Sequence, residues 1–176
     1  MDLWLKDANA VVVGGGRGMG LAAARCLADD GARVALLGRT QDVLDRAAEG
    51  LAERGSPDAV GLVADTTDAA AVQRVFDEIG ERWKGGLNVL INAVGPGTRG
   101  TFDDLTDEQW REAFDDGVMG MVHCVRSALP LLRQALRASC AHAPRGSARR
   151  NGPRRRVSRV TTQFVHDRRQ RQRRRR

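Results

Sequence analysis

Five glycines follow a short apolar run near the start of the chain, within the segment AVVVGGGRGMGLAAA at residues 10–24. They are Gly14, Gly15, Gly16, Gly18 and Gly20. Glycine loses more conformational freedom on folding than any other residue, so this density costs stability unless the missing side chains serve a purpose. Two interpretations are open: a flexible turn, or a backbone that closely approaches a phosphate.

The residues on either side of the glycines favour the phosphate interpretation. Residues 8–13 are typical of a buried strand, and residues 18–30 are typical of a helix. A helix that begins directly after a strand and a glycine turn presents unpaired N–H groups and the positive end of its dipole, which together bind a pyrophosphate. A P-loop is excluded, because no Gly-Lys-Ser/Thr sequence follows the glycines.

Strand-like and helix-like segments alternate as far as about residue 138. The expected strands are 8–13, 33–38, 59–64 and 87–95; the expected helices are 18–30, 41–54 after Thr40 as N-cap, Thr67 or Asp68 to Trp83, and the capping box Thr106–Gln109 to about Ala138, with a break near Gly117 and Gly120. This alternation predicts parallel strands joined by right-handed crossovers. The strands are apolar on both faces, so helices should cover both sides of the sheet. The predicted fold class is therefore α/β, with a doubly wound parallel sheet.

Composition divides the chain near residue 138. Residues 1–140 carry 15 basic and 21 acidic side chains, whereas residues 141–176 carry 14 arginines and one acid, so the net charge of +7 describes neither part. A segment with few apolar residues and many charges of one sign cannot form a hydrophobic core. We therefore expect a folded domain over 1–138 and a disordered, arginine-rich segment over 139–176.

The arginine-rich segment raises two hypotheses. It is a basic arm that binds nucleic acid through phosphates without sequence preference, or its reading frame differs from that of the preceding residues. GC-rich DNA read out of frame yields mainly Arg, Ala, Pro and Gly, which is the composition found here. The second hypothesis is the preferred one.

The rest of the composition predicts a cytoplasmic protein without a metal site. No apolar run reaches the ~18 residues of a membrane span, and the acidic N-terminus does not fit a signal peptide, so no membrane partner is expected. Cys26, Cys124 and Cys140 lack paired spacing and are expected to be reduced and structural. The histidines lack metal-ligand spacing, and His123 is expected to be packed or half-exposed in a helix.

Several short motifs occur in a fixed order along residues 7–136. They are the spacing Gly14-x-x-x-Gly18-x-Gly20, Asp65 after the third strand, Asn92-Ala93-Val94-Gly95 at the end of the fourth, FDDLTDEQW at 102–110, and VRSALPLLR at 125–133. Together they resemble the short-chain dehydrogenase/reductase family, whose fingerprints are T-G-x-x-x-G-x-G and N-N-A-G. Two departures occur: Val13 stands in the place of the threonine, and Ala93 replaces the second asparagine.

The resemblance implies a Rossmann-like fold and a dinucleotide site at the strand ends. The implied cofactor residues are Gly14, Gly18 and Gly20 in the phosphate turn, Met19 against the cofactor, Asp65 at the adenine, and Asn92, Ala93 and Gly95 on the floor. Structural alternatives stay open for two of them. Asp65 is also suited to a turn or a helix cap, and Asn92 to a cap on the strand end.

Two arginines favour NADP over NAD. A carboxylate about 20 residues after the glycines would accept from the ribose 2′-OH of NAD, but strand two ends with Arg39 and no acid. Arg17 lies within the glycine turn, and two guanidinium groups suit a 2′-phosphate. The alternative is that Arg17 and Arg39 are solvated surface charges.

The catalytic residues of the family are not found. Carbonyl reduction by hydride needs a proton donor at the forming alkoxide, and in this family a tyrosine supplies it, with a lysine four positions later. The chain contains no tyrosine, its lysines are Lys6 and Lys84, and the family's relay asparagine corresponds to Gly117. No catalytic residue is assigned, the small-molecule substrate is unidentified, and the chain is expected to be inactive.

In this family the fourth strand lies inside the sheet and is paired on its far side by a fifth. Nothing after Ala138 is typical of that strand. We therefore expect residues 88–94 to form an apolar sheet edge that promotes aggregation. The family is oligomeric, and the same assembly is not expected of this chain.

Overall fold

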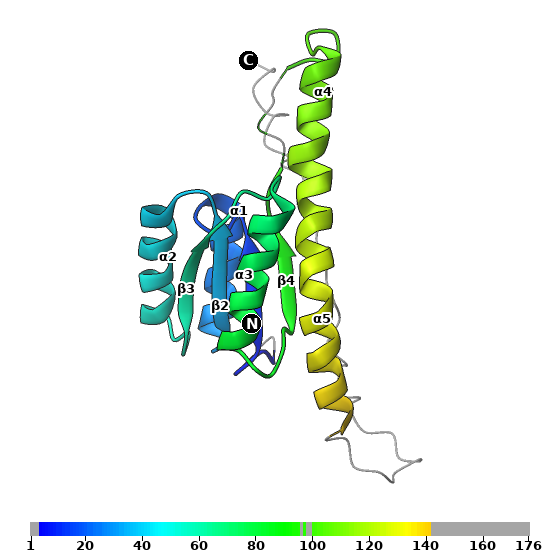
Figure 1. Cartoon of the computed structure of the whole chain (residues 1–176). Coiled ribbons are helices and arrows are strands. Elements are labelled where there is room, and N and C mark those ends of the chain that lie inside the picture. Colours follow the sequence, from blue (N-terminus) through cyan, green and yellow to red (C-terminus); the bar gives the residue numbers. More distant parts are fainter. Residues whose placement is uncertain (1–3, 96, 98–99, 142–176) are drawn as a thin grey trace, which may run out of the picture.

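The computed structural model describes residues 4–95, 97 and 100–141, and it contains one parallel sheet. The strands are β1 (Asn9–Val13), β2 (Arg33–Gly38), β3 (Ala59–Val63) and β4 (Val89–Asn92), in the spatial order β3-β2-β1-β4. The doubly wound α/β fold is confirmed (Figure 1). β4 is shorter than the expected 87–95 and lies at an edge of the described sheet.

Helices cover both faces of the sheet, as the apolar strands predicted. The helices are α1 (Gly18–Asp29), α2 (Gln41–Glu53), α3 (Ala69–Arg82), α4 (Asp107–Phe114) and α5 (Gly120–Ala141). Alternate residues of β1 belong to opposite layers: Ala10 and Val12 pack with α1 and α2, and Val11 and Val13 pack with α3 and α5. Every residue of β1 is buried, since the strand lies between two covered faces.

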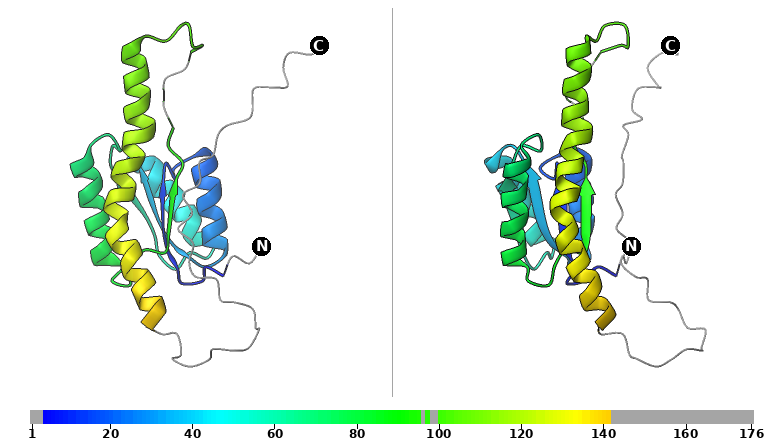
Figure 2. Two further views of the ribbon diagram at one scale, coloured as in Figure 1. Left: turned by 90° about the vertical axis from the view of Figure 1, so that its right-hand side faces the viewer. Right: turned by 45° about the vertical axis from the view of Figure 1, so that its right-hand side comes forward.

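The last two helices form one rod. α4 and α5 are joined by a π-helical turn, η1 (Asp115–Met119), and the rod extends past the sheet at both ends (Figure 2). The expected break near Gly117 and Gly120 is present as this π-helical interruption, where α4 ends and α5 begins, although the rod continues through it. Glycine weakens a helix by only about 1 kcal/mol per residue, and Gly120 is buried against Thr66. α5 also continues to Ala141, beyond the expected boundary at Ala138.

The helix caps agree only partly with the sequence. The capping box of Thr106 and Gln109 is present at the start of α4. Asp68, rather than Thr67, caps α3, and its Oδ1 accepts from the N–H groups of Ala70 and Ala71 at 2.9 and 3.0 Å. Thr40 is the N-cap residue of α2, as expected, although its side chain makes no capping hydrogen bond.

The cysteines differ in their surroundings. Cys124 is fully buried, and burial raises the pKa of its thiol to about 12, so it is an inert core residue. Cys26 and Cys140 are exposed, which corrects the expectation that all three are structural.

Within the described residues there is no metal-binding cluster, and none of the helices there is long and apolar enough to cross a membrane.

A polar cluster joins the start of β3 to the end of α3. The carboxylate of Asp58 accepts from Nε and Nη2 of Arg82, at 2.8 and 2.6 Å, and from Nε1 of Trp83 at 2.8 Å. The bond from Arg82 is the main cause that lowers the pKa of Asp58 below its ordinary 3.8. Because the pKa of this carboxyl is lower in the folded state than in the unfolded state, its ionisation stabilises the fold at pH values above its ordinary pKa. This stabilisation is lost as the pH falls through the pKa of the folded state.

We predict that Asp58→Asn lowers the free energy of unfolding by about 1 kcal/mol at neutral pH, because the partly exposed ion pair is screened by water. Since the contribution needs an ionised carboxylate, the difference from the unmodified chain should shrink below about pH 4. Urea unfolding at about pH 7 and about pH 3 measures both values. Asp103→Asn, at an exposed position outside the described ion pairs, should show no such difference. A pH-independent loss in Asp58→Asn would contradict the assignment.

Candidate cofactor site

A cleft of about 510 Å³ lies at the carboxyl edge of the sheet, where the loops after all four strands meet. Nine of the ten residues singled out from the sequence line it: Gly14, Arg17, Gly18, Met19, Gly20, Arg39, Asp65, Ala93 and Gly95. Its volume is within the range typical of small-molecule and cofactor sites. The structure thus brings these residues together, and their contact with a cofactor stays a prediction.

The glycine turn is closed by contacts that side chains would prevent. Gly14 has φ +75°, a conformation that residues with a Cβ rarely adopt, and its N–H donates to the carbonyl of Leu37 at 2.7 Å. A Cβ on Gly20 would overlap the carbonyl oxygen of Gly14. These two positions bring the first turn of α1 directly against the end of β1, which is why the turn tolerates no larger residue there.

The N-terminus of α1 faces the cleft without a side-chain cap. Arg17 is the N-cap residue and makes no side-chain capping bond, and the first turn of α1 contains no acidic residue. Arg17, Gly18, Met19 and Gly20 all line the cleft. The N–H groups of this turn and the positive end of the helix dipole are therefore suited to an anion.

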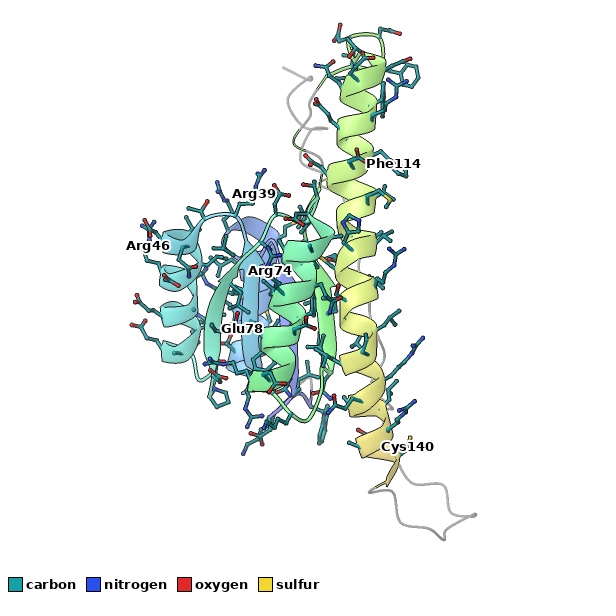
Figure 3. All side chains as sticks on the ribbon, in the orientation of Figure 1. Arg39, Arg46, Arg74, Glu78, Phe114 and Cys140 are labelled. Atoms are coloured by element: carbon teal, nitrogen blue, oxygen red, sulfur yellow. The ribbon has the colours of Figure 1, made fainter. Side chains whose placement is uncertain are left out.

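A carboxylate and a guanidinium group lie at the end of the cleft formed by β2 and β3. Oδ1 of Asp65 accepts from the N–H and the hydroxyl of Thr67 at 2.9 and 2.8 Å. These bonds, together with the charge of Arg39, lower the pKa of Asp65, so this carboxylate is ionised at neutral pH. Asp65 therefore does form a turn, as its structural alternative predicted, while also lining the cleft. Arg39 projects outward from the strand-end edge (Figure 3).

The cleft also contains residues that the sequence did not single out. Thr66 follows Asp65 in the loop after β3, and Asp116 reaches the cleft from η1. Asp116 directly precedes Gly117, the position compared with the family's relay asparagine. Attention to the neighbours of that position would have found it, whereas Thr66 carried no signal of its own.

Asn92 differs from the other predicted site residues. It lies at the end of β4, is only 9% exposed, and does not line the cleft. Neither Oδ1 nor Nδ2 has a hydrogen-bond partner among the described residues, so the side chain forms no cap there either. Its register partner on β1 is Val13, the residue in the place of the family's threonine. Register partners on neighbouring strands point to the same face of a sheet, so a hydroxyl at position 13 would be placed to bond the buried amide of Asn92.

We predict that Val13→Thr supplies this partner. The threonine hydroxyl replaces a methyl group of similar size. Where Asn92 is present, the free-energy cost of burying this hydroxyl should be offset by a hydrogen bond to the Asn92 amide. In an Asn92→Leu background the same hydroxyl has no partner and should cost about 1–3 kcal/mol. Urea unfolding of the four proteins gives the coupling energy, expected to be favourable by about 1–2 kcal/mol. A coupling of zero would show that the two side chains do not interact.

Comparisons with known proteins agree with this geometry. The family model for short chain dehydrogenase matches residues 8–140. The uncharacterized oxidoreductase YvrD of Bacillus subtilis is 36% identical over 133 residues, which are 74% of this chain and 48% of that protein. The oxidoreductase asL5 of Sarocladium schorii is 30% identical over 131 residues, or 51% of its length. The chain therefore spans about half the length of the curated relatives that it matches.

Solved structures are similar over the same part of the chain. L-sorbose reductase from Gluconobacter frateurii, complexed with NADPH and L-sorbose, is 30% identical with a TM-score of 0.69, covering 76% of this chain and 50% of that one. An NADH-dependent reductase complexed with NAD is 29% identical with a TM-score of 0.70, covering 77% and 56%. With the parallel sheet and the glycine turn at its carboxyl edge, these matches show that the chain belongs to the short-chain dehydrogenase family.

Proposed function

We propose that this chain binds a nicotinamide dinucleotide as the cofactor part of an oxidoreductase that transfers hydride between the nicotinamide ring and a carbonyl or alcohol carbon. The observation that carries the proposal is the uncapped N-terminus of α1, held against β1 by Gly14 and Gly20 and open to the cleft. Solved relatives complexed with NADPH and with NAD support a dinucleotide as the ligand. The pyrophosphate would lie at this helix end, and the adenosine beside Asp65.

We further propose that NADP is preferred over NAD. The loop after β2 reads Gly38-Arg39-Thr40, so it offers no carboxylate to accept from a ribose 2′-OH. Arg39 and Arg17 both line the cleft and are both exposed, so their guanidinium groups can reach a 2′-phosphate from two sides. Charge-assisted bonds of this kind are about twice as strong as neutral ones.

Titration with both cofactors tests the preference. Arg39→Asp should weaken NADPH binding by at least about tenfold, because a charge-assisted hydrogen bond is lost and a repulsive carboxylate is added. NADH binding should be unchanged or tighter. Arg74→Asp makes the same charge change on the exposed surface of α3, outside the cleft, and should affect neither cofactor (Figure 3). Equal affinity of the unmodified chain for NADPH and NADH would contradict the preference.

Hydride transfer to a carbonyl carbon leaves an alkoxide that must take up a proton. This chain has no tyrosine to supply it. Lys6 and Lys84 precede β1 and β4, so they lie at the amino edge of the sheet, opposite the cleft. Neither lysine can therefore assist a proton transfer at the reacting end of the cofactor. The role proposed for the described residues is to bind and orient the cofactor.

We predict binding without turnover. The purified 176-residue chain of verified mass should change NADPH fluorescence on binding, yet oxidise no NADPH above the buffer rate with ketones or aldehydes. Absorbance at the nicotinamide band, followed with and without each carbonyl compound, measures this. Sustained carbonyl-dependent oxidation would refute the prediction. The hypothesis of a nucleic-acid-binding arm concerns residues 141–176, of which residues 142–176 lie outside the described part of the chain, and no observation favours it.

A further inference from the structure

Helix α5 is bonded to the loop between β3 and α3. Nδ1 of His123 lies 2.9 Å from the carbonyl oxygen of Thr66. A carbonyl oxygen can only accept, so Nδ1 carries the hydrogen and donates it. His123 is half-buried and is separated from Thr66 by 57 residues in sequence. The bond therefore fixes two distant segments relative to each other.

The residue one turn earlier in α5 allows this contact. A Cβ on Gly120 would lie 2.7 Å from Oγ1 of Thr66 and 3.0 Å from its Cβ, so no larger residue fits without moving Thr66. One turn after His123, the hydroxyl of Ser127 donates to Oε1 of Gln73 on α3 at 2.9 Å. Residues 120, 123 and 127 lie on one face of the helix. This face of α5 thus holds the loop at Thr66 and the helix that follows it.

Thr66 is part of a hydrogen-bonded turn that also contains Asp65. Oδ1 of Asp65 accepts from Thr67, and the backbone carbonyl of Asp65 accepts from the N–H of Asp68 at 3.1 Å. Both Asp65 and Thr66 line the cleft. Because the carbonyl of Thr66 lies in the middle of this turn, a bond that fixes it also fixes the direction of the Asp65 carboxylate.

We infer that His123 is a positioning residue of the cofactor site: through Thr66 it holds Asp65 in place for the adenosine part of the dinucleotide. This rests on the proposed function. The neighbouring inward positions of α5, Cys124 and Ala128, are core residues, whereas His123 is half-buried and is not part of the hydrophobic cluster. The polar ring therefore adds something that packing does not require. A pre-organised turn loses less entropy when the ligand binds, so affinity rises.

Two substitutions separate the hydrogen bond from the volume of the ring. His123→Leu fills the position but removes the donor. His123→Asn places an amide nitrogen at the same number of bonds from the backbone as Nδ1, so it keeps the donor. The ligands are NADPH and adenosine 2′,5′-bisphosphate, which lacks the nicotinamide. Amide hydrogen exchange at Thr67 and Asp68, in the full chain without ligand, reports on the turn itself.

In His123→Leu, exchange at both amides should rise, and the affinities for NADPH and for adenosine 2′,5′-bisphosphate should fall by the same factor, about tenfold. His123→Asn should stay within about twofold of the unmodified chain in all three measurements. Thermal unfolding of both variants should coincide, which shows that the loss is local.

Three results would overturn the inference. Unchanged exchange in His123→Leu would show that the bond does not hold the turn. Raised exchange with unchanged affinity would show that the turn does not serve the cofactor. Equal losses in His123→Asn and His123→Leu would assign the effect to ring packing. If the unmodified chain binds neither ligand, the proposed function fails, while the exchange comparison still decides whether His123 holds the loop.

Discussion

The close approach of α1 to the end of β1 is the constraint on which the cofactor site depends. Gly20 lies against the carbonyl of Gly14, and Gly14 adopts a positive φ to make the turn. A side chain at either position would push the helix away from the strand. The uncapped N–H groups would then no longer face the cleft, and neither Arg17 nor Met19 would line it. The glycine cluster therefore sets the position of the end of the cleft that is proposed to hold the phosphates.

The order of the strands explains why the cleft lies where it does. From β1 the chain passes through β2 to β3 on one side, and then crosses back to place β4 on the other side of β1. The loops after β1 and β4 consequently leave the sheet in opposite directions. Ligands in open α/β sheets bind in the crevice at such a switch point. Ala93 and Gly95 line the cleft from the β4 side, opposite Arg39 and Asp65 on the other.

Local patterns in the sequence predicted the helices and strands. Features that depend on contacts between residues far apart in the chain could not be predicted from it. The apolar runs and the glycine spacing were sufficient for the four strands and for most of the cleft, because each depends on residues close together in the chain. The break near Gly117 takes the form of a π-helical turn within one rod, and the packing of Gly120 on Thr66 beside it is a contact across more than fifty residues, which spacing does not predict. The unpartnered amide of Asn92 likewise depends on the register between β1 and β4. His123 was expected to be packed or half-exposed, but its bond to Thr66 was not foreseeable from spacing.

The two ends of the candidate cofactor site are lined by different parts of the chain. The end proposed for the phosphate and adenosine is lined by residues between the turn after β1 and the loop after β3, and α5 is bonded to that loop through His123 and Thr66. The opposite end has Asp116 of the rod and the loop after β4, next to a strand that lies at the sheet edge. The same rod carries exposed apolar side chains at Trp110, Phe114 and Val118, and Phe114 points away from the sheet (Figure 3). Under the proposed function, binding of the dinucleotide and chemistry on its nicotinamide ring would therefore rest on different parts of the fold, and the described residues line the part proposed for binding.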